Sequence, residues 1–133
     1  MATRPIKEIL YKDLDITFAK HPITNQPAVL KNENAISRAV KNLVLTNKYE
    51  RRFQPTVYSD VVASLFENFD PVTVQVIKND IRNVIRNYEP RADLIRIDLH
   101  DNLELNGIDV TIVYRPLNAK ELVNIAVFLE RTR

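Results

Sequence analysis

The stretch DPVTVQVIKNDIRNVIRNYEPRADLIRIDLH, residues 70–100, decides the fold, because its hydrophobic pattern changes period partway along. Asp70 is a good helix N-cap, and Pro71 suits the first helical position, where a missing N–H costs nothing. An apolar stripe with helical spacing follows, made of Val74, Ile77, Ile81, Val84, Ile85 and Tyr88. Pro90 interrupts this pattern, so the sequence predicts a helix over residues 71–88.

After this helix, apolar and polar residues alternate, which is the pattern of a half-buried strand. Residues 95–100 and 108–114 both alternate in this way, and the loop between them contains Asn106-Gly107. A third alternating stretch begins near Leu122 and runs to Leu129. A helix starting at Ala119 is the alternative there, but the β-branched residues favour a strand.

Two shorter helices are expected before the long one. The first covers residues 35–46, with Asn34 as its N-cap, and the second covers residues 61–67, with Ser59 or Asp60 as its cap. The second helix has its apolar face at Val62, Leu65 and Phe66. Residues 47–58 lose the helical period and contain Pro55, which predicts a loop.

Residues 1–33 show no sustained period, although Ile16 and Phe18 flank Thr17 as in a short extended piece. We interpret this segment as an arm that lies on the domain or on a neighbour; a long ordered loop is the alternative. Residues 34–133 then form one α+β domain, with N-terminal helices packed on one face of a C-terminal three-stranded sheet. The last strand is apolar on both faces and stands at a sheet edge, so either a crossing loop covers it or a partner chain adds strands there.

The composition excludes several classes of function. Gly107 is the single glycine, and phosphate-binding loops and dinucleotide-binding folds need several. Cysteine is absent, which excludes disulfides and thiolate metal sites, and His21 and His100 lack ligand-like neighbours. We therefore expect no cofactor and no metal. No apolar run is long enough to cross a bilayer, the N-terminus does not resemble a signal peptide, and the net charge of +2 does not demand a nucleic-acid partner.

The tripeptide Glu89-Pro90-Arg91 stands where the long helix ends. The helix dipole disfavours a carboxylate at that end by about 0.3–1 kcal/mol, so an ordinary surface position would more comfortably hold a lysine. Pro90 keeps Glu89 extended, and in an extended segment residues i and i+2 point to the same side. Glu89 and Arg91 could therefore be presented together to another subunit. The alternative is a helix stop with a local ion pair that contributes little on the surface.

Three segments carry a resemblance to a known family: LFENFDP at residues 65–71, NYEPRADL at residues 87–94, and the run of Glu50, Arg51, Phe53 and Pro55. With the long helix between the first two, they resemble the baseplate wedge and sheath-initiator family of contractile phage tails, which is related to TssE of type VI secretion and has been labelled lysozyme-like. Glycines usually flank the family's loop motif, whereas Lys48-Tyr49 and Tyr58 stand there in this chain.

The resemblance implies a sheath-like, mainly antiparallel sheet and a structural role without catalysis. Glu89, Pro90 and Arg91 would dock the domain on other wedge subunits, with six copies per baseplate in the virion, assembled in the host cytoplasm. Tail sheath subunits would pair with the last strand by strand addition, and the tail tube or hub is a further candidate partner. The residues expected to pair are Val123, Asn124, Ile125, Ala126, Val127 and Phe128.

Two other functions are weighed against this one. A peptidoglycan hydrolase would need a pair of carboxyl groups beside a sugar cleft, and the available acids are Glu67, Asp70, Glu89, Asp93 and Asp98. Nucleic-acid binding would use the helical row of Lys78, Arg82 and Arg86, but a solvated helix face has the same pattern and no aromatic residues interleave with it. We therefore expect no nucleic-acid or membrane partner.

Overall fold

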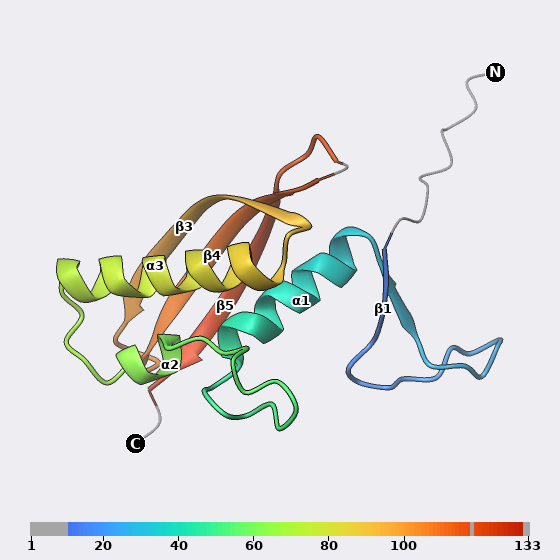
Figure 1. Cartoon of the computed structure of the whole chain (residues 1–133), viewed down its shortest axis with the longest axis horizontal. Helices are drawn as coiled ribbons and strands as arrows, with labels where there is room; N and C mark the ends of the chain where they lie inside the picture. The colour runs from blue at the N-terminus through green and yellow to red at the C-terminus, as the bar shows by residue number, and fades with distance from the viewer. Residues whose placement is uncertain (1–10, 118, 132–133) are drawn as a thin grey trace.

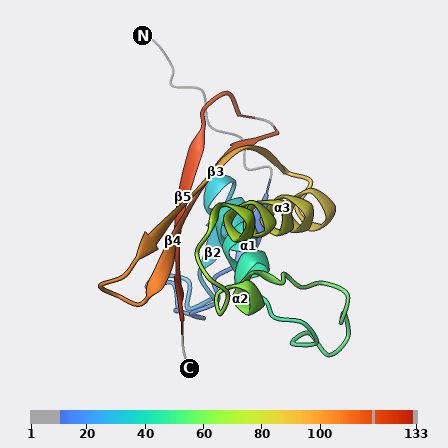
Figure 2. The ribbon, with the colours of Figure 1, turned by 90° about the vertical axis from the view of Figure 1, so that its left-hand side faces the viewer.

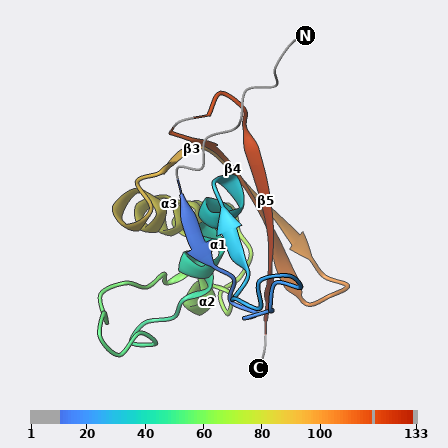
Figure 3. The same ribbon diagram turned by 90° about the vertical axis from the view of Figure 1, so that its right-hand side faces the viewer.

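The computed structural model describes residues 11–117 and 119–131, and the chain forms an α+β fold in which three helices cover one face of a three-stranded sheet (Figure 1). The helices are α1 (Glu33–Leu45), α2 (Val61–Ser64) and α3 (Pro71–Tyr88). The sheet consists of β3 (Ala92–Asn102), β4 (Gly107–Pro116) and β5 (Val123–Glu130). A separate two-stranded sheet, β1 (Lys12–Leu14) and β2 (Val29–Lys31), stands beside the start of α1 (Figure 3).

The long helix α3 has the bounds that its sequence predicts. Asp70 adopts an extended conformation, and its carboxylate accepts a hydrogen bond of 2.7 Å from the Thr73 N–H. This bond lowers the pKa of Asp70 below its ordinary value, because the charged carboxylate is the better acceptor. Ile77, Ile81 and Ile85 are buried, as the apolar stripe requires.

The two shorter helices depart from prediction at their ends. Helix α1 begins two residues earlier than expected, and its N-cap position is Asn32 rather than Asn34. The Asn32 side chain caps no helical N–H and instead accepts a hydrogen bond from the Tyr11 N–H, 3.2 Å away. Helix α2 has Asp60 at its N-cap position, but the Asp60 side chain makes no capping hydrogen bond. The helix ends at Ser64, so Phe66 lies beyond it and is 62% exposed, contrary to the predicted apolar face.

The C-terminal sheet is antiparallel with the order β3-β4-β5, which confirms the third strand over the alternative helix. A bulge at Ile95 shifts the register between Leu94 and Arg96. The predicted row of apolar residues therefore breaks: Ile95 is half exposed, whereas Leu94 packs on the core beside Ile97. A bulge places one extra residue in a strand, so the side chains before and after it face differently from simple alternation.

The core lies between the helices and one face of the sheet (Figure 2). Its largest fully buried side chain is Tyr114 of β4, whose hydroxyl lies 2.8 Å from Ser37 Oγ and donates to the Glu33 carbonyl at 3.2 Å. Burial raises the pKa of this tyrosine. The tyrosine thus joins the central strand to the first turn of α1.

None of the helices in the described part of the chain covers the opposite face of the sheet (Figure 2). Val113 lies on this face between its cross-strand partners Arg96 and Asn124. Phe128 lies there too, and its ring packs over Gly107, where a Cβ would overlap both the ring and the Leu129 carbonyl oxygen. The single glycine is therefore needed for close packing rather than for an unusual backbone angle.

Residues 11–31 form the β1–β2 hairpin, so the predicted extended piece at Ile16–Phe18 is wrong. Ile16 and Thr17 lie in a turn, and Phe18 has a φ of 50°. Residues 1–10 of the predicted arm lie outside the described residues. In the part of the chain that the structure describes, no helix has the length and apolar character needed to span a membrane.

Candidate docking corner and free sheet edge

The docking corner, Glu89-Pro90-Arg91, lies at the C-terminal end of α3. Glu89 is the C-cap, and its N–H donates to the Ile85 carbonyl at 2.9 Å. Its carboxylate accepts two hydrogen bonds from Arg91: Nε to Oε1 at 2.6 Å and Nη2 to Oε2 at 2.8 Å. This paired geometry is the strong, forked form of an arginine–carboxylate contact.

The burial of the corner differs from the expected outward presentation. Glu89 is only 4% exposed, and the exposed part of the pair is the guanidinium of Arg91, whose side chain is 27% exposed. A carboxylate at a helix C-terminus is opposed by the dipole, and a buried carboxylate needs a compensating charge. Arg91 supplies that charge, and the hydrogen bond raises the pKa of its guanidinium further. The corner therefore exposes the Arg91 guanidinium, while the Glu89 carboxylate that it neutralises is buried.

The β1 strand covers the other side of Arg91, a contact for which the sequence holds no signal. The Arg91 guanidinium carbon lies 5.3 Å from the centroid of the Tyr11 ring, within cation–π range. Its Nη2 atom lies 3.7 Å from Asp13 Oδ2, so the guanidinium is shared between two carboxylates. About eighty residues separate these groups in the chain, and no local pattern links them.

A cleft of about 270 Å³ opens next to the corner, and we call it the corner cleft. It is lined by residues of β1, α1, the 46–59 loop and α3: Asp13, Leu14, Arg38, Ala39, Asn42, Leu43, Arg51, Tyr88 and Glu89. The structure thus brings Arg51 of the loop motif to the same cleft as Glu89 of the docking corner. The other three loop-motif residues, Glu50, Phe53 and Pro55, do not line it.

The loop motif itself is held closed at its base. The Ser59 N–H donates to the Thr46 carbonyl at 3.0 Å, and Glu50 Oε2 accepts from the Asn47 N–H at 2.7 Å. Phe53 lies at 100% exposure. Tyr49 adopts a φ of 64°, a backbone conformation that costs a non-glycine residue about 1 kcal/mol or more. The Lys48 ammonium lies 5.4 Å from the Tyr49 ring centroid and 5.3 Å from that of Tyr58.

Strand β5 forms one edge of the three-stranded sheet, and no fourth strand pairs with it among the described residues. The Arg131 N–H donates inward to the Asn106 carbonyl at 2.9 Å. Because the amide groups of a strand point to alternate sides, residues 123, 125, 127 and 129 bond to β4. The backbone groups of Asn124, Ala126 and Phe128 therefore point away from β4, along the free edge.

The side chains of the predicted pairing residues divide between the two faces. Ile125 and Val127 are buried in the core, and Val123 packs against it. Asn124, Ala126 and Phe128 are exposed on the uncovered face, where Phe128 retains 40% exposure. The end of the strand is fixed by Arg131, whose side chain reaches Asp101 at 3.1 Å and the Leu65 carbonyl at 3.1 Å. The sequence analysis missed this role of Arg131.

In residues 11–117 and 119–131, no group of three or more histidine or acidic side chains is placed to hold a metal ion. His21 and His100 lie on different elements, the hairpin loop and β3.

Solved structures share this fold. A protein called a tail lysozyme from Geobacter sulfurreducens matches with a TM-score of 0.73 at 18% identity, over 80% of this chain and 97% of that one. A chain of the anti-feeding prophage baseplate matches with a TM-score of 0.64 at 17% identity, over 92% and 87%. A chain of the postcontracted pyocin R2 baseplate matches with 0.53 at 14%, over 83% and 96%. The fold is thus one that occurs in proteins of contractile baseplates.

The sequence identifies the family. Residues 31–120, more than half of the chain, match the family described as baseplate wedge protein gp25, and the chain belongs to that family. Baseplate wedge protein gp25 of Enterobacteria phage T4 is 35% identical over 66 residues, which make up 47% of this chain and 50% of the T4 protein. The match spans about half the length of this relative.

Proposed function

We propose that this protein is a structural, non-enzymatic part of the baseplate wedge of a contractile tail. In this proposal it docks on other wedge subunits through the docking corner and the corner cleft, and it starts the sheath by strand addition at β5. The observation that carries the proposal is the free edge of β5 on a domain of the baseplate wedge family. An unpaired edge strand is a template for another chain, and main-chain pairing suits a joint that a sheath repeats many times.

The direction of the β5 amides gives a sharp test of strand addition. Replacing Ala126 with proline removes an outward N–H and spares the bonds to β4, and proline is tolerated on edge strands in this orientation. We expect Ala126→Pro to retain a thermal midpoint close to wild type and to yield baseplates without sheath in electron micrographs. Ala126→Val, which keeps the N–H, is the matched control. Sheath of normal length on Ala126→Pro baseplates would refute strand addition at this edge.

The docking role rests on the corner cleft, which is lined by Arg51 and Glu89, and on Arg91, whose side chain is 27% exposed. Arg51→Glu reverses a charge in this cleft, whereas Arg52→Glu makes the same change on the adjacent residue, which does not line it. We expect the first variant to be depleted from purified baseplates and the second to be incorporated normally. Equal incorporation of both would contradict docking through the cleft.

The absence of catalysis is part of the proposal and is supported by the contacts of the candidate acids. Glu89 is paired with Arg91, Asp93 with Arg115 at 2.8 Å, and Asp98 with Arg96 at 2.7 Å. Asp70 caps α3, and its lowered pKa is the opposite of what a proton-donating carboxyl needs. We expect no fall in turbidity when the purified protein is added to cell walls. Clear lysis that is lost on replacing one acid would refute this part.

A further inference from the structure

The β1–β2 hairpin displays an unusual combination of side chains on its outward face. Backbone bonds join Asn32 to Tyr11 and Asp15 to Ala28, so the intervening pairs Lys12–Lys31 and Leu14–Val29 are of the non-hydrogen-bonded kind. Side chains in such pairs lie closest together. Lys12, Leu14, Val29 and Lys31 share this side of the hairpin, which we call the cationic face.

The lysine pair has no compensating carboxylate among the described residues. Like charges directly opposite each other destabilise a strand pair, and among the described residues neither lysine forms an ion pair. The two aspartates of the hairpin are engaged elsewhere, since Asp13 lies 3.7 Å from Arg91 and Asp15 lies 3.9 Å from Arg38. The hairpin therefore directs its acids toward the domain and its lysines away from it.

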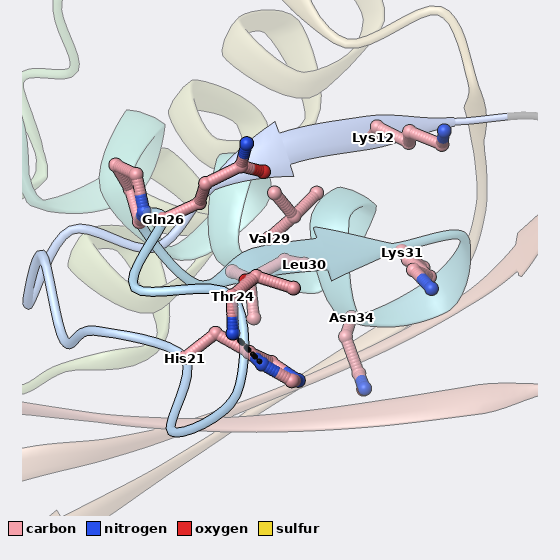
Figure 4. Close-up of a pocket in the computed structure, with 9 residues that line it drawn as sticks. Lys12, His21, Thr24, Gln26, Val29, Leu30, Lys31 and Asn34 are labelled. Carbon is pink, nitrogen blue, oxygen red and sulfur yellow. Dashed lines mark hydrogen bonds between the residues drawn. The ribbon is translucent and has the colours of Figure 1, made fainter.

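A cavity of about 520 Å³ lies beside the cationic face (Figure 4). Besides Lys12 and Lys31, it is lined by neutral polar groups of the hairpin loop and of α1, among them Thr24, Gln26 and Asn34, and by the apolar side chain of Val29. Among the described residues, no carboxylate lines it. Leu14 and Val29, next to the lysines, are 61% and 44% exposed, which is large for apolar side chains on a two-stranded sheet.

We propose that the cationic face binds an acidic peptide segment of another protein, with apolar residues among its carboxylates. Carboxylates would lie between Lys12 and Lys31 and remove their repulsion, and apolar side chains would cover Leu14 and Val29. A nucleic acid fits less well, because phosphate tracking uses several cations along a line and does not cover exposed apolar side chains. This surface is separate from the β5 edge and shares only Leu14 with the lining of the corner cleft. Lys12 and Lys31 do not line that cleft, so a test at Lys31 is independent of docking there.

The test uses a fluorescent peptide that alternates glutamate with leucine and valine, titrated with the full-length protein and followed by anisotropy. Lys31→Glu is the informative variant, because it places opposite charges across the strands and so favours the hairpin fold while it removes the binding charge. We expect affinity to fall at least tenfold for Lys31→Glu with no decrease in thermal midpoint. Lys120→Glu makes the same change on an exposed lysine outside the hairpin and should leave affinity unchanged.

Three results would overturn the proposal. The wild-type protein could fail to bind the peptide, or Lys120→Glu could weaken binding as much as Lys31→Glu. Alternatively, a single-stranded oligonucleotide or an anionic vesicle could bind more tightly than the peptide and lose that binding in Lys31→Glu, which would assign the face to phosphate groups. An all-glutamate peptide of the same length measures the apolar contribution, and we expect it to bind more weakly than the alternating one.

Discussion

Arg91 holds the carboxylate of Glu89 with two hydrogen bonds, of 2.6 and 2.8 Å, and thereby allows a helix to end on a buried acid. Helix C-termini and buried sites both disfavour a carboxylate, so the charged Glu89 side chain requires the neutralising charge of Arg91. The contact is local in sequence, but Arg91 also contacts Tyr11 and Asp13 at the start of the β1–β2 hairpin.

Replacing Arg91 with alanine should destabilise the protein by about 2 kcal/mol, because the buried carboxylate would lose its partner. Urea unfolding followed by circular dichroism measures this change. Arg96→Ala breaks the exposed ion pair with Asp98 and serves as the control, with an expected loss below about 1 kcal/mol. Similar losses for the two variants would show that the Glu89 carboxylate is hydrated after all.

Replacing Gly107 with alanine should cost about 1–3 kcal/mol, because the new methyl group meets both the Phe128 ring and the backbone oxygen of Leu129. The Phe128 ring can rotate away from the new methyl group. The Leu129 carbonyl can move only if the pairing of β4 with β5 also shifts. The double variant Gly107→Ala, Phe128→Ala should therefore remain less stable than Phe128→Ala alone. If the double variant were as stable as Phe128→Ala, the overlap with the Phe128 ring would account for the whole loss of stability.

The N-cap of α3 gives a prediction about pH. Folding lowers the pKa of Asp70, so the stability that its charge contributes is complete above the ordinary value of 3.8 and is lost as pH falls through the folded-state pKa. Asp70→Asn keeps a capping oxygen without the charge. We expect a lower thermal midpoint than wild type at pH 6 and convergence of the two proteins at pH values below the folded-state pKa. If the two thermal midpoints still differed below the folded-state pKa, the charge of Asp70 would not be the cause of the difference.

The Tyr114 hydroxyl connects β4 to the first turn of α1. Tyr114→Phe should lower the free energy of unfolding by about 1 kcal/mol, because Ser37 and the Glu33 carbonyl are partly buried and would lose this hydrogen-bond partner. Tyr88→Phe is a suitable comparison, since its hydroxyl donates to the Thr56 carbonyl at an exposed position where water can replace it. We expect a smaller loss there, measured by chemical unfolding. Equal losses would argue that the Ser37 contact contributes nothing specific.

The strongly periodic parts of the sequence predicted the structure well. The bounds of α3 follow from Asp70, Pro71 and Pro90, and the β-branched residues of β5 distinguish strand from helix. These signals are local, and the fold agrees with them. The α+β class was accessible for the same reason, whereas the family was suggested by the resemblance at residues 65–71 and 87–94.

The failures have nonlocal causes. The bulge at Ile95 is set by how β3 pairs with β4, and the contacts of Arg91 with Tyr11 and Asp13 join parts of the chain about eighty residues apart. The hairpin itself has strands of three residues, too short for a periodic signal. The roles of the docking corner, of the loop motif and of β5 in assembly remain predictions, as do the domain bounds.

The position of Arg91 between α3 and the hairpin has a mechanical consequence. A pull on β1 would act on Tyr11 and Asp13, and both of these residues contact the Arg91 guanidinium. The hairpin is thus attached to the domain at the same residue that neutralises the end of the longest helix. A force applied to the hairpin would therefore also act on the C-terminal end of α3.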